Sequence, residues 1–242
     1  MEEDRSPLLR CCRPFADGVA PQSDDFLLDA SGVEKVAAAC AGVLAPHGDE
    51  QRAAQLLSCG APLVFVGAAA LGDSNIIRRL VASYGPERVG VVVAAARRKI
   101  SWSFEIESNA DFKTVAPSSG EAALEVLDAD GAATGVLLVW WLQEMRNIGA
   151  AQFVVRADIR DDADLNICAD LVERLGDALW LGPLHDEQPP LAHWLEYAGC
   201  RRWALPVALH EQVAATQQAG AGEASSPSSP SSPLTSAPEQ SV

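Results

Sequence analysis

The sequence predicts an α/β protein whose main domain is a closed (βα)8 barrel of the TIM type. Eight short apolar runs alternate along the chain with longer amphipathic segments, which is typical of strands that alternate with helices. The short runs are rich in β-branched residues and lack polar alternation, as expected for parallel strands that are buried on both faces. Eight strand–helix units also fit the length of the chain before its Ser/Pro-rich end.

The apolar runs expected to be strands are residues 8–12, 25–29, 43–45, 63–67, 89–94, 152–157, 178–182 and 203–207. The amphipathic segments expected to be helices are residues 32–41, 50–58, 74–84, 136–148, 167–175, 190–197 and 210–216.

Two places break this alternation. Only residues 13–24 separate the first two strands, which is too short for a loop and a crossover helix, so the first helix is expected to be missing. Residues 97–133 form a long polar segment, and alternation within residues 101–107 predicts a β-hairpin strand. We expect this enlarged insertion after the fifth strand to extend over the barrel mouth.

The chain is expected to divide into a barrel domain, residues 1–216, and a tail, residues 217–242. A Ser-Ser-Pro repeat runs from residue 225 to residue 233, and the tail has no apolar periodicity. Such a segment buries too little apolar surface to offset the conformational entropy lost on ordering. We therefore expect the tail to be disordered.

The charge balance argues against nucleic acid and anionic lipid as partners. The chain carries 33 acidic and 18 basic side chains, for a formal net charge of −15, so phosphate backbones and lipid headgroups repel it. The sequence contains no apolar run long enough to span a membrane, and its acidic beginning is unlike a secretory signal. A cytoplasmic protein is expected.

The cysteines do not predict a metal or redox site. Six cysteines are scattered along the chain without a Cys-x-x-Cys pair, so we expect small buried apolar residues and no metal or cofactor.

Several segments resemble the cyclase subunit of imidazole glycerol phosphate synthase, a (βα)8 barrel family of histidine biosynthesis. The sequence Leu-Leu-Ser-Cys-Gly-Ala-Pro-Leu-Val stands at residues 56–64, and Thr-Gly-Val-Leu-Leu-Val-Trp-Trp stands at residues 134–141. Further matching segments are residues 68–71, 82–85, 91–93, 149–150, 159–161 and 199–211. Thr134 lies before the expected helix of this region, where it is either the family's turn or a helix N-cap.

The resemblance implies a lyase that is supplied with ammonia by a glutaminase subunit. In this family, ammonia attacks a phosphoribulosyl-formimino-aminoimidazole carboxamide ribonucleotide, giving imidazole glycerol phosphate and aminoimidazole carboxamide ribonucleotide. Two aspartates at the ends of the first and fifth strands act as general acid and base. Glycine-rich loops and backbone N–H groups hold the two phosphates of the substrate.

This sequence departs from the family at both catalytic positions. The resemblance places Arg13 where the family has its first aspartate and Ala94 where it has the second. Arginine cannot act as a base at neutral pH, and alanine has no proton to donate. Asp161 matches a third aspartate on the catalytic face and is the remaining candidate, although a solvated acidic loop with Asp158, Asp162 and Asp164 explains it more simply in a chain of net charge −15.

The phosphate-binding positions implied by the family are Gly48, Gly67, Gly182 and Val207. Single glycines stand where the family has glycine pairs, and Pro183 lacks an N–H donor. We expect phosphate to bind weakly.

Three functions remain open. The first is a divergent cyclase of histidine biosynthesis whose activity is impaired. The second is a catalytically inactive barrel that binds a small phosphorylated metabolite or serves as a scaffold for a partner. The third, an unrelated barrel aldolase or isomerase, lacks a catalytic Lys or Glu at a strand end.

Overall fold

The computed structural model describes residues 7–98, 108–109, 112–113, 122–185 and 189–223. Eight of its strands are parallel and form a closed ring, because β10 pairs with β5 and β12 pairs with β1. These strands are β1 (Leu8–Pro14), β2 (Phe26–Leu28), β3 (Gly42–Ala45), β4 (Val64–Val66), β5 (Val89–Arg97), β10 (Gln152–Arg156), β11 (Leu179–Gly182) and β12 (Arg202–Pro206). The prediction of a (βα)8-like barrel is therefore confirmed.

The barrel interior is filled by one inward side chain from each strand. This layer consists of Cys12, Phe26, Leu44, Phe65, Val92, Val154, Trp180 and Ala204. The ring of Phe26 meets Phe65 and Trp180 edge-on, with centroids 5.2 and 5.0 Å apart. Since side chains alternate along a strand, the residues two positions further along each strand also point inward, at the carboxyl end of the barrel. These residues form the barrel mouth.

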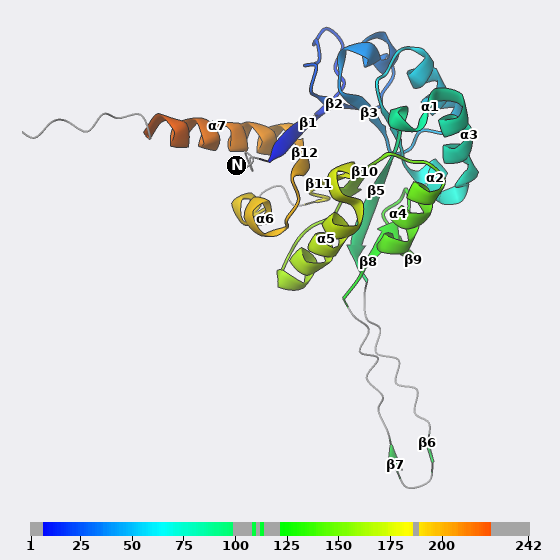
Figure 1. Ribbon diagram of the computed structural model, residues 1–242, viewed down its shortest axis with the longest axis vertical. Coiled ribbons are helices and arrows are strands. Elements are labelled where there is room, and N and C mark those ends of the chain that lie inside the picture. Colours follow the sequence, from blue (N-terminus) through cyan, green and yellow to red (C-terminus); the bar gives the residue numbers. More distant parts are fainter. Residues whose placement is uncertain (1–6, 99–107, 110–111, 114–121, 186–188, 224–242) are drawn as a thin grey trace, which may run out of the picture. The chain divides into compact units, whose positions relative to one another are not determined.

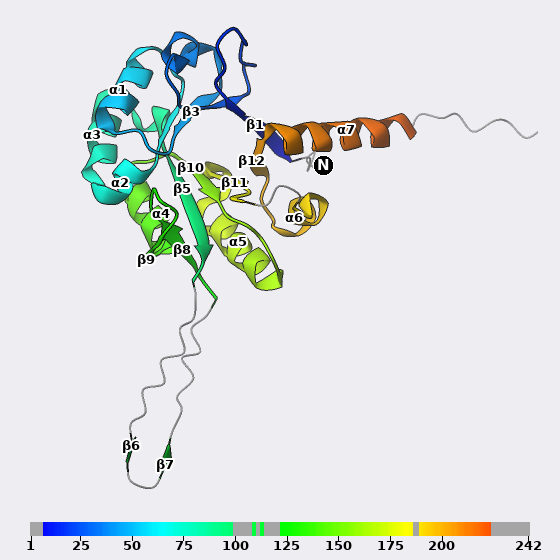
Figure 2. The same ribbon diagram turned by 180° about the vertical axis from the view of Figure 1, so that it is seen from behind.

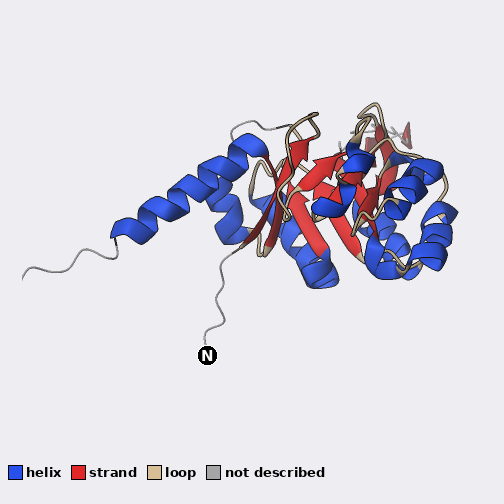
Figure 3. Ribbon diagram, turned by 90° about the horizontal axis from the view of Figure 1, so that it is seen from above, coloured by secondary structure: helices blue, strands red, loops and turns tan. Residues whose placement is uncertain are grey.

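Helices lie on the outer side of the strands (Figures 1 and 2), and Figure 3 shows the strands in red flanked by helices in blue. They are α1 (Glu50–Ser58), α3 (Asn75–Tyr84), α4 (Leu138–Asn147), α5 (Asp162–Leu175) and α6 (Leu191–Tyr197). Helix α1 begins where the Asp49 carboxylate accepts a 2.8 Å hydrogen bond from the Arg52 backbone N–H, which is a typical N-cap.

The first two connections of the barrel contain no α-helix. Residues 15–25, all of which the structure describes, form turns only. The helix expected at residues 32–41 is wrong, because two short 3-10 helices stand there, η1 (Val33–Lys35) and η2 (Ala37–Ala39). Only residues 29–41 separate β2 from β3, and Ala41 at the end of this connection donates a hydrogen bond to the Asp25 carbonyl at 2.9 Å. The connection therefore has little length for an α-helix.

The insertion after β5 continues the sheet beyond the barrel. The end of β5 pairs antiparallel with β8 (Leu124–Leu127), which pairs with β9 (Ala133–Leu137). A small antiparallel pair joins β6 (Ser108–Asn109) to β7 (Phe112–Lys113). The hairpin strand expected at residues 101–107 lies outside the described residues.

Strands β8 and β9 were not predicted, and α4 begins two residues later than predicted. Thr134 is not a helix N-cap, because it lies within β9 and its hydroxyl donates to the Val126 carbonyl at 2.7 Å. The N-cap of α4 is Leu137, which lacks a side-chain capping bond. The cross-strand pairing with β8 holds this segment extended, which a local capping signal cannot reveal.

The described residues also include two short 3-10 helices, η3 (Pro86–Arg88) and η4 (Gly176–Ala178), and two further α-helices. Helix α2 (Ala68–Gly72) follows β4 and was not expected. Helix α7 (Val207–Glu223) includes residues 217–223, which the sequence analysis assigned to the tail, because Ala and Gln favour a helix. The chain divides into two units, Met1–His210 and Glu211–Val242. In the part that the structure describes, no helix is long and apolar enough to cross a bilayer.

Candidate ligand-binding site at the barrel mouth

A cavity of about 220 Å³ lies at the carboxyl ends of β3, β4, β5 and β10. Its apolar wall is formed by Leu71, Val92, Val126, Leu127 and Trp141, and its polar lining includes His47, Asp128, Arg156 and His185. Residues from Val126 to Gly131 belong to the insertion after β5, so the insertion does contribute to the mouth of the barrel. Barrels of this type bind their ligands at this end.

Of the four predicted phosphate-binding residues, only Gly67 lines this cavity. Its backbone N–H is already used, because it donates to the Ala45 carbonyl at 3.1 Å. A Cβ at residue 67 would lie 2.3 Å from the Pro46 carbonyl oxygen. The close approach of two chain segments therefore explains Gly67, rather than a phosphate cradle.

The other three predicted phosphate positions lie elsewhere. Gly182 ends β11, and a Cβ there would lie 2.3 Å from the Ala204 carbonyl oxygen. Val207 is the half-buried first residue of α7. Gly48 lines a separate open hollow with Asp29, Glu34, Asp49 and Arg52.

The hollow around Gly48 does not suit an anion. Its only arginine, Arg52, donates to the Asp29 carboxylate at 2.7 Å and to Glu34 at 3.1 Å. These ion pairs neutralise the guanidinium, and the remaining carboxylates repel negative charge.

Arg13 faces away from the barrel interior. Its neighbour Cys12 points inward, so Arg13 lies on the outer face of β1, where its Nε donates to the Asp25 carboxylate at 3.0 Å. Asp25 is buried and also accepts from the Gln22 backbone N–H at 2.9 Å. Of the two residues that the resemblance places at the family's aspartate positions, Ala94 lines the cavity and Arg13 does not.

Asp161 holds the start of α5 and does not line the cavity. Its carboxylate accepts from the backbone N–H groups of Ala163 and Asp164 at 3.0 and 3.1 Å, and Arg97 Nη1 donates to it at 2.8 Å. The Arg97 guanidinium and these backbone bonds lower the pKa of Asp161 from 3.8 to about 2. A carboxylate engaged in this way is a weak general base, so Asp161 has a structural role.

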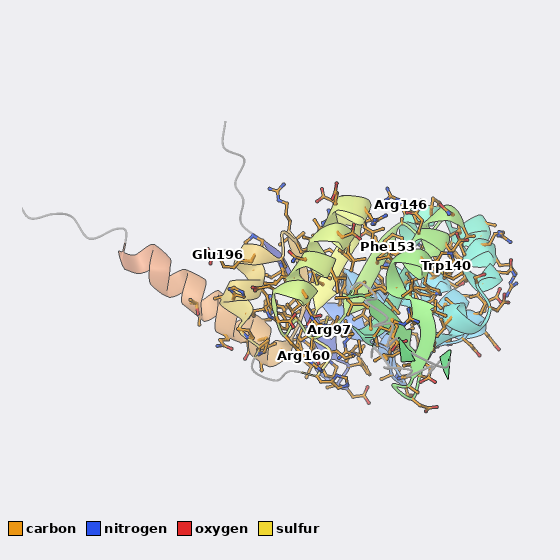
Figure 4. All side chains as sticks on the ribbon, turned by 90° about the horizontal axis from the view of Figure 1, so that it is seen from below. Arg97, Trp140, Arg146, Phe153, Arg160 and Glu196 are labelled. Carbon is orange, nitrogen blue, oxygen red and sulfur yellow. The ribbon has the colours of Figure 1, made fainter. Side chains whose placement is uncertain are left out.

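The neighbouring Asp164 joins the same contact. It is buried and accepts from Arg97 Nε at 2.9 Å and from the Arg160 backbone N–H at 3.0 Å. Figure 4 labels Arg97, whose side chain donates to this carboxylate, and Arg160, which donates to it through the backbone N–H. Through their contacts with Arg97, Asp161 and Asp164 thus connect the end of β5 to the start of α5.

Arg156 is the functional candidate that the sequence analysis missed. It ends β10 two residues after the inward Val154, lies beside Ala94 in the strand register, and lines the cavity. Its Nε and Nη2 donate to the carbonyls of Pro183 and Leu184 at 3.4 and 3.2 Å. Among the described residues, no carboxylate lies within ion-pairing distance of its guanidinium.

Asp158 and His185 form a second polar group at the mouth. The imidazole Nδ1 lies 3.2 Å from Asp158 Oδ2, while Asp158 Oδ1 accepts from the backbone N–H groups of Leu184 and His185 at 2.9 and 2.8 Å. The sequence analysis placed Asp158 in a solvated acidic loop and did not consider His185. A charged residue two positions beyond an inward strand residue was the available signal for Arg156. No comparable signal joins Asp158 to His185.

Thiol chemistry and metal binding have little support near the barrel mouth. Burial raises the pKa of the Cys12 thiol to about 12, so Cys12 is a neutral thiol at physiological pH and a poor nucleophile. Within the described ranges, no three His, Cys, Asp or Glu side chains are grouped so that they could hold a metal ion.

No protein-family model matches this chain, and no curated protein matches it. The function must therefore be argued from the cavity itself.

Proposed function

We propose that the barrel mouth binds a small anionic metabolite, with Arg156 as the group that holds the anion. This is the binding function that the sequence left open beside the cyclase reaction, and its ligand is the phosphorylated small molecule that the resemblance implies. The observation that carries the proposal is the position of Arg156, which lines the cavity and has only backbone carbonyls as partners among the described residues.

The surroundings of Arg156 support an anion as its missing partner. The bonds to Pro183 and Leu184 use Nε and one hydrogen of Nη2, so Nη1 is left to bind a ligand. Arginine binds phosphate and carboxylate through two parallel hydrogen bonds. The small side chain of Ala94 leaves room beside the guanidinium, and the apolar wall lowers the local dielectric, which strengthens the attraction.

The same geometry is unfavourable for the two-aspartate chemistry. The inward residues at the end of β1 are Cys12 and Pro14, and the facing residue on β5 is Ala94, so no carboxyl stands at either position. The Asp161 carboxylate forms an ion pair with Arg97 and caps the N-terminus of α5.

The cyclase reaction of histidine biosynthesis is the second candidate, and Asp128 is the observation that favours it. Asp128 is the one carboxylate among the described cavity-lining residues. Incubation with the ribonucleotide substrate and an ammonium salt, in place of a glutaminase partner, tests this candidate. We expect no imidazole glycerol phosphate, whereas turnover that Asp128→Asn abolishes would favour the cyclase.

A reducing compartment such as the cytoplasm is the proposed location. The six cysteines all lie in described residues, and no disulfide joins any two of them, as is usual in cytosolic proteins.

Calorimetric titration with sodium sulfate tests the role of Arg156. Arg156→Gln is expected to weaken sulfate binding at least tenfold, because a charged hydrogen bond is worth about 1.5–3 kcal/mol. Arg156→Lys keeps the charge and is expected to retain part of the affinity. Arg78→Gln changes an exposed arginine on α3 that bonds to Asn75, and serves as the matched control.

Unchanged affinity in Arg156→Gln, or equal losses in Arg156→Gln and Arg78→Gln, would disprove the proposed site. Thermal unfolding of each variant separates a lost contact from a lost fold.

A further inference from the structure

Two charged side chains form hydrogen bonds with the loop after β11: Arg156 at the end of β10 and Asp158, two residues beyond that strand. Arg156 binds the carbonyls of Pro183 and Leu184, while Asp158 binds the N–H groups of Leu184 and His185. The loop after β11 is therefore bonded through its carbonyls to Arg156 at the end of β10 and through its N–H groups to Asp158 just after β10. This places the His185 imidazole at the cavity that Arg156 lines.

We infer that His185 is the second anion-binding group of this cavity and that it takes up one proton from solvent when the anion binds. The inference rests on the proposed function and deepens it, because it assigns Asp158 as a positioning residue and His185 as a ligand contact. The distance of 3.2 Å between Nδ1 and Asp158 Oδ2 carries the assignment.

The two ring nitrogens have different partners, which explains the coupling to a proton. In the neutral imidazole, Nδ1–H donates to Asp158 and Nε2 carries a lone pair, which repels an anion. When a solvent proton binds Nε2, the imidazolium donates to the carboxylate from Nδ1 and to the anion from Nε2. No other bond forms or breaks, and the buffer supplies the proton.

Some of the charged groups near His185 favour the protonated form of its imidazole, and others oppose it. Asp158 and the anion favour the imidazolium, and Asp128 lines the same cavity and also favours it. Arg156 and Arg160 oppose it, and Arg160 Nη2 lies 3.7 Å from Asp158 Oδ2. By linkage, an anion that favours the protonated imidazole binds more tightly where that form is present.

His47 is the alternative site of proton uptake. It lines the same cavity from the loop after β3 and is exposed. The difference is that Asp158 contacts His185, so the experiment must compare the two histidines directly.

Sulfate is the suitable probe because its charge stays at −2 from pH 6 to pH 8, so any proton taken up is bound by the protein. Calorimetric titrations with sodium sulfate at one pH, in buffers of different ionisation enthalpy, give the number of protons bound with each anion. We expect proton uptake for the full chain, none for His185→Gln, and reduced uptake for Asp158→Asn. His193→Gln, on α6 against Tyr197, is the matched control and is expected to behave as the unaltered chain.

The pH dependence gives a second readout. Sulfate affinity of the unaltered chain is expected to fall from pH 6 to pH 8, by at most about tenfold per pH unit for one linked proton. His185→Gln is expected to bind weakly and equally at both pH values.

The outcomes separate this inference from the proposed function. Sulfate binding that is at least tenfold weaker in Arg156→Gln, together with proton uptake that His185→Gln removes, supports both. Sulfate binding that depends on Arg156 but takes up no proton overturns the inference and leaves the anion site. Proton uptake that persists in His185→Gln, or that His47→Gln alone removes, also overturns it. If the unaltered chain does not bind sulfate, both are wrong.

Discussion

The two arginines Arg13 and Arg156 differ in role because they occupy opposite faces of the barrel wall. Arg13 points outward and forms an ion pair with the buried Asp25. Arg156 points inward, where the neighbouring strands present Ala94 and Gly182. Because successive side chains on a strand point to opposite faces, the position of each arginine along its strand decides whether its guanidinium contacts a carboxylate outside the barrel or lines the cavity inside it.

The reactivity of the cysteine thiols tests which of these side chains are buried. Burial raises the pKa of Cys12 and Cys168 to about 12 and that of Cys200 to about 11, and it also raises the pKa of Cys40. Of the six cysteines, only Cys59 is exposed.

We therefore expect a single fast-reacting thiol when the folded protein meets a disulfide reagent at pH 8, because the thiolate is the reactive form. Cys59→Ser is expected to remove this fast phase, and unfolding in urea is expected to expose all of the others. A fast phase that remains in Cys59→Ser would show that an interior thiol is reactive.

At the scale of elements, Arg97 joins the end of β5 to the start of α5. It forms ion pairs with Asp161 and with the buried Asp164, and Asp161 also caps the helix. The sequence predicted α5 to begin at residue 167, but it begins at Asp162, because the cap at Asp161 sets its start.

Stability is expected to depend on pH through Asp161. Its pKa in the folded protein, about 2, lies below the ordinary value of 3.8. The carboxylate therefore stabilises the fold above about pH 4, and this contribution is lost as the pH falls through 2. Asp161→Asn keeps a capping side chain, so it is expected to be less stable than the unaltered chain at pH 7 and nearly equal to it near pH 2.

Urea unfolding of both proteins at several pH values measures this difference. Asp170→Asn is the control, since Asp170 forms an exposed pair with Arg174 on α5 alone, and such a pair contributes little. A stability difference for Asp161→Asn that does not change with pH would contradict the assignment.

At the scale of the whole barrel, one interior layer receives a side chain from every strand. Phe65 from β4 packs in this layer against Phe26, and Gly90 on β5 leaves room for its ring, since a Cβ there would lie 2.6 Å from it. The side chains of this layer therefore join strands from all parts of the barrel.

Phe65→Ala is expected to lower the free energy of unfolding by about 3–5 kcal/mol, because it leaves a cavity in this layer. Trp140→Ala, which removes a larger but exposed side chain on α4 (Figure 4), is expected to change it by only about 0.5 kcal/mol. Urea unfolding measures both. Equal effects would mean that the interior layer does not carry the stability of the barrel.

Much of the fold could be predicted from the sequence because its signals are local. Short apolar runs marked all eight parallel strands, and the predicted bounds of α1 match those of the structure, in which Asp49 caps the helix. The pairing of β8 with β9 was not predictable from the local pattern around Thr134, because it depends on a partner strand and not on neighbouring residues.

The candidate site was predictable only in part. The sequence pointed to the strand ends and named Ala94 and Gly67, which do line the cavity. It also pointed to Asp161, Gly48, Gly182 and Val207, which do not line it. Residues far apart in the chain, Arg156 and His185, instead meet there through a loop that β10 holds.

The amino-acid sequence by itself determined the alternation of buried strands and outer helices, the excess of acidic side chains and the absence of carboxyls at Arg13 and Ala94. These features depend on residue type and periodicity along the chain. Only the tertiary structure decided that Arg13 is neutralised on the outside and that Arg156, Asp158 and His185 meet at one mouth. The reason is physical: which charges neutralise each other depends on distances across strands that the order of residues does not contain.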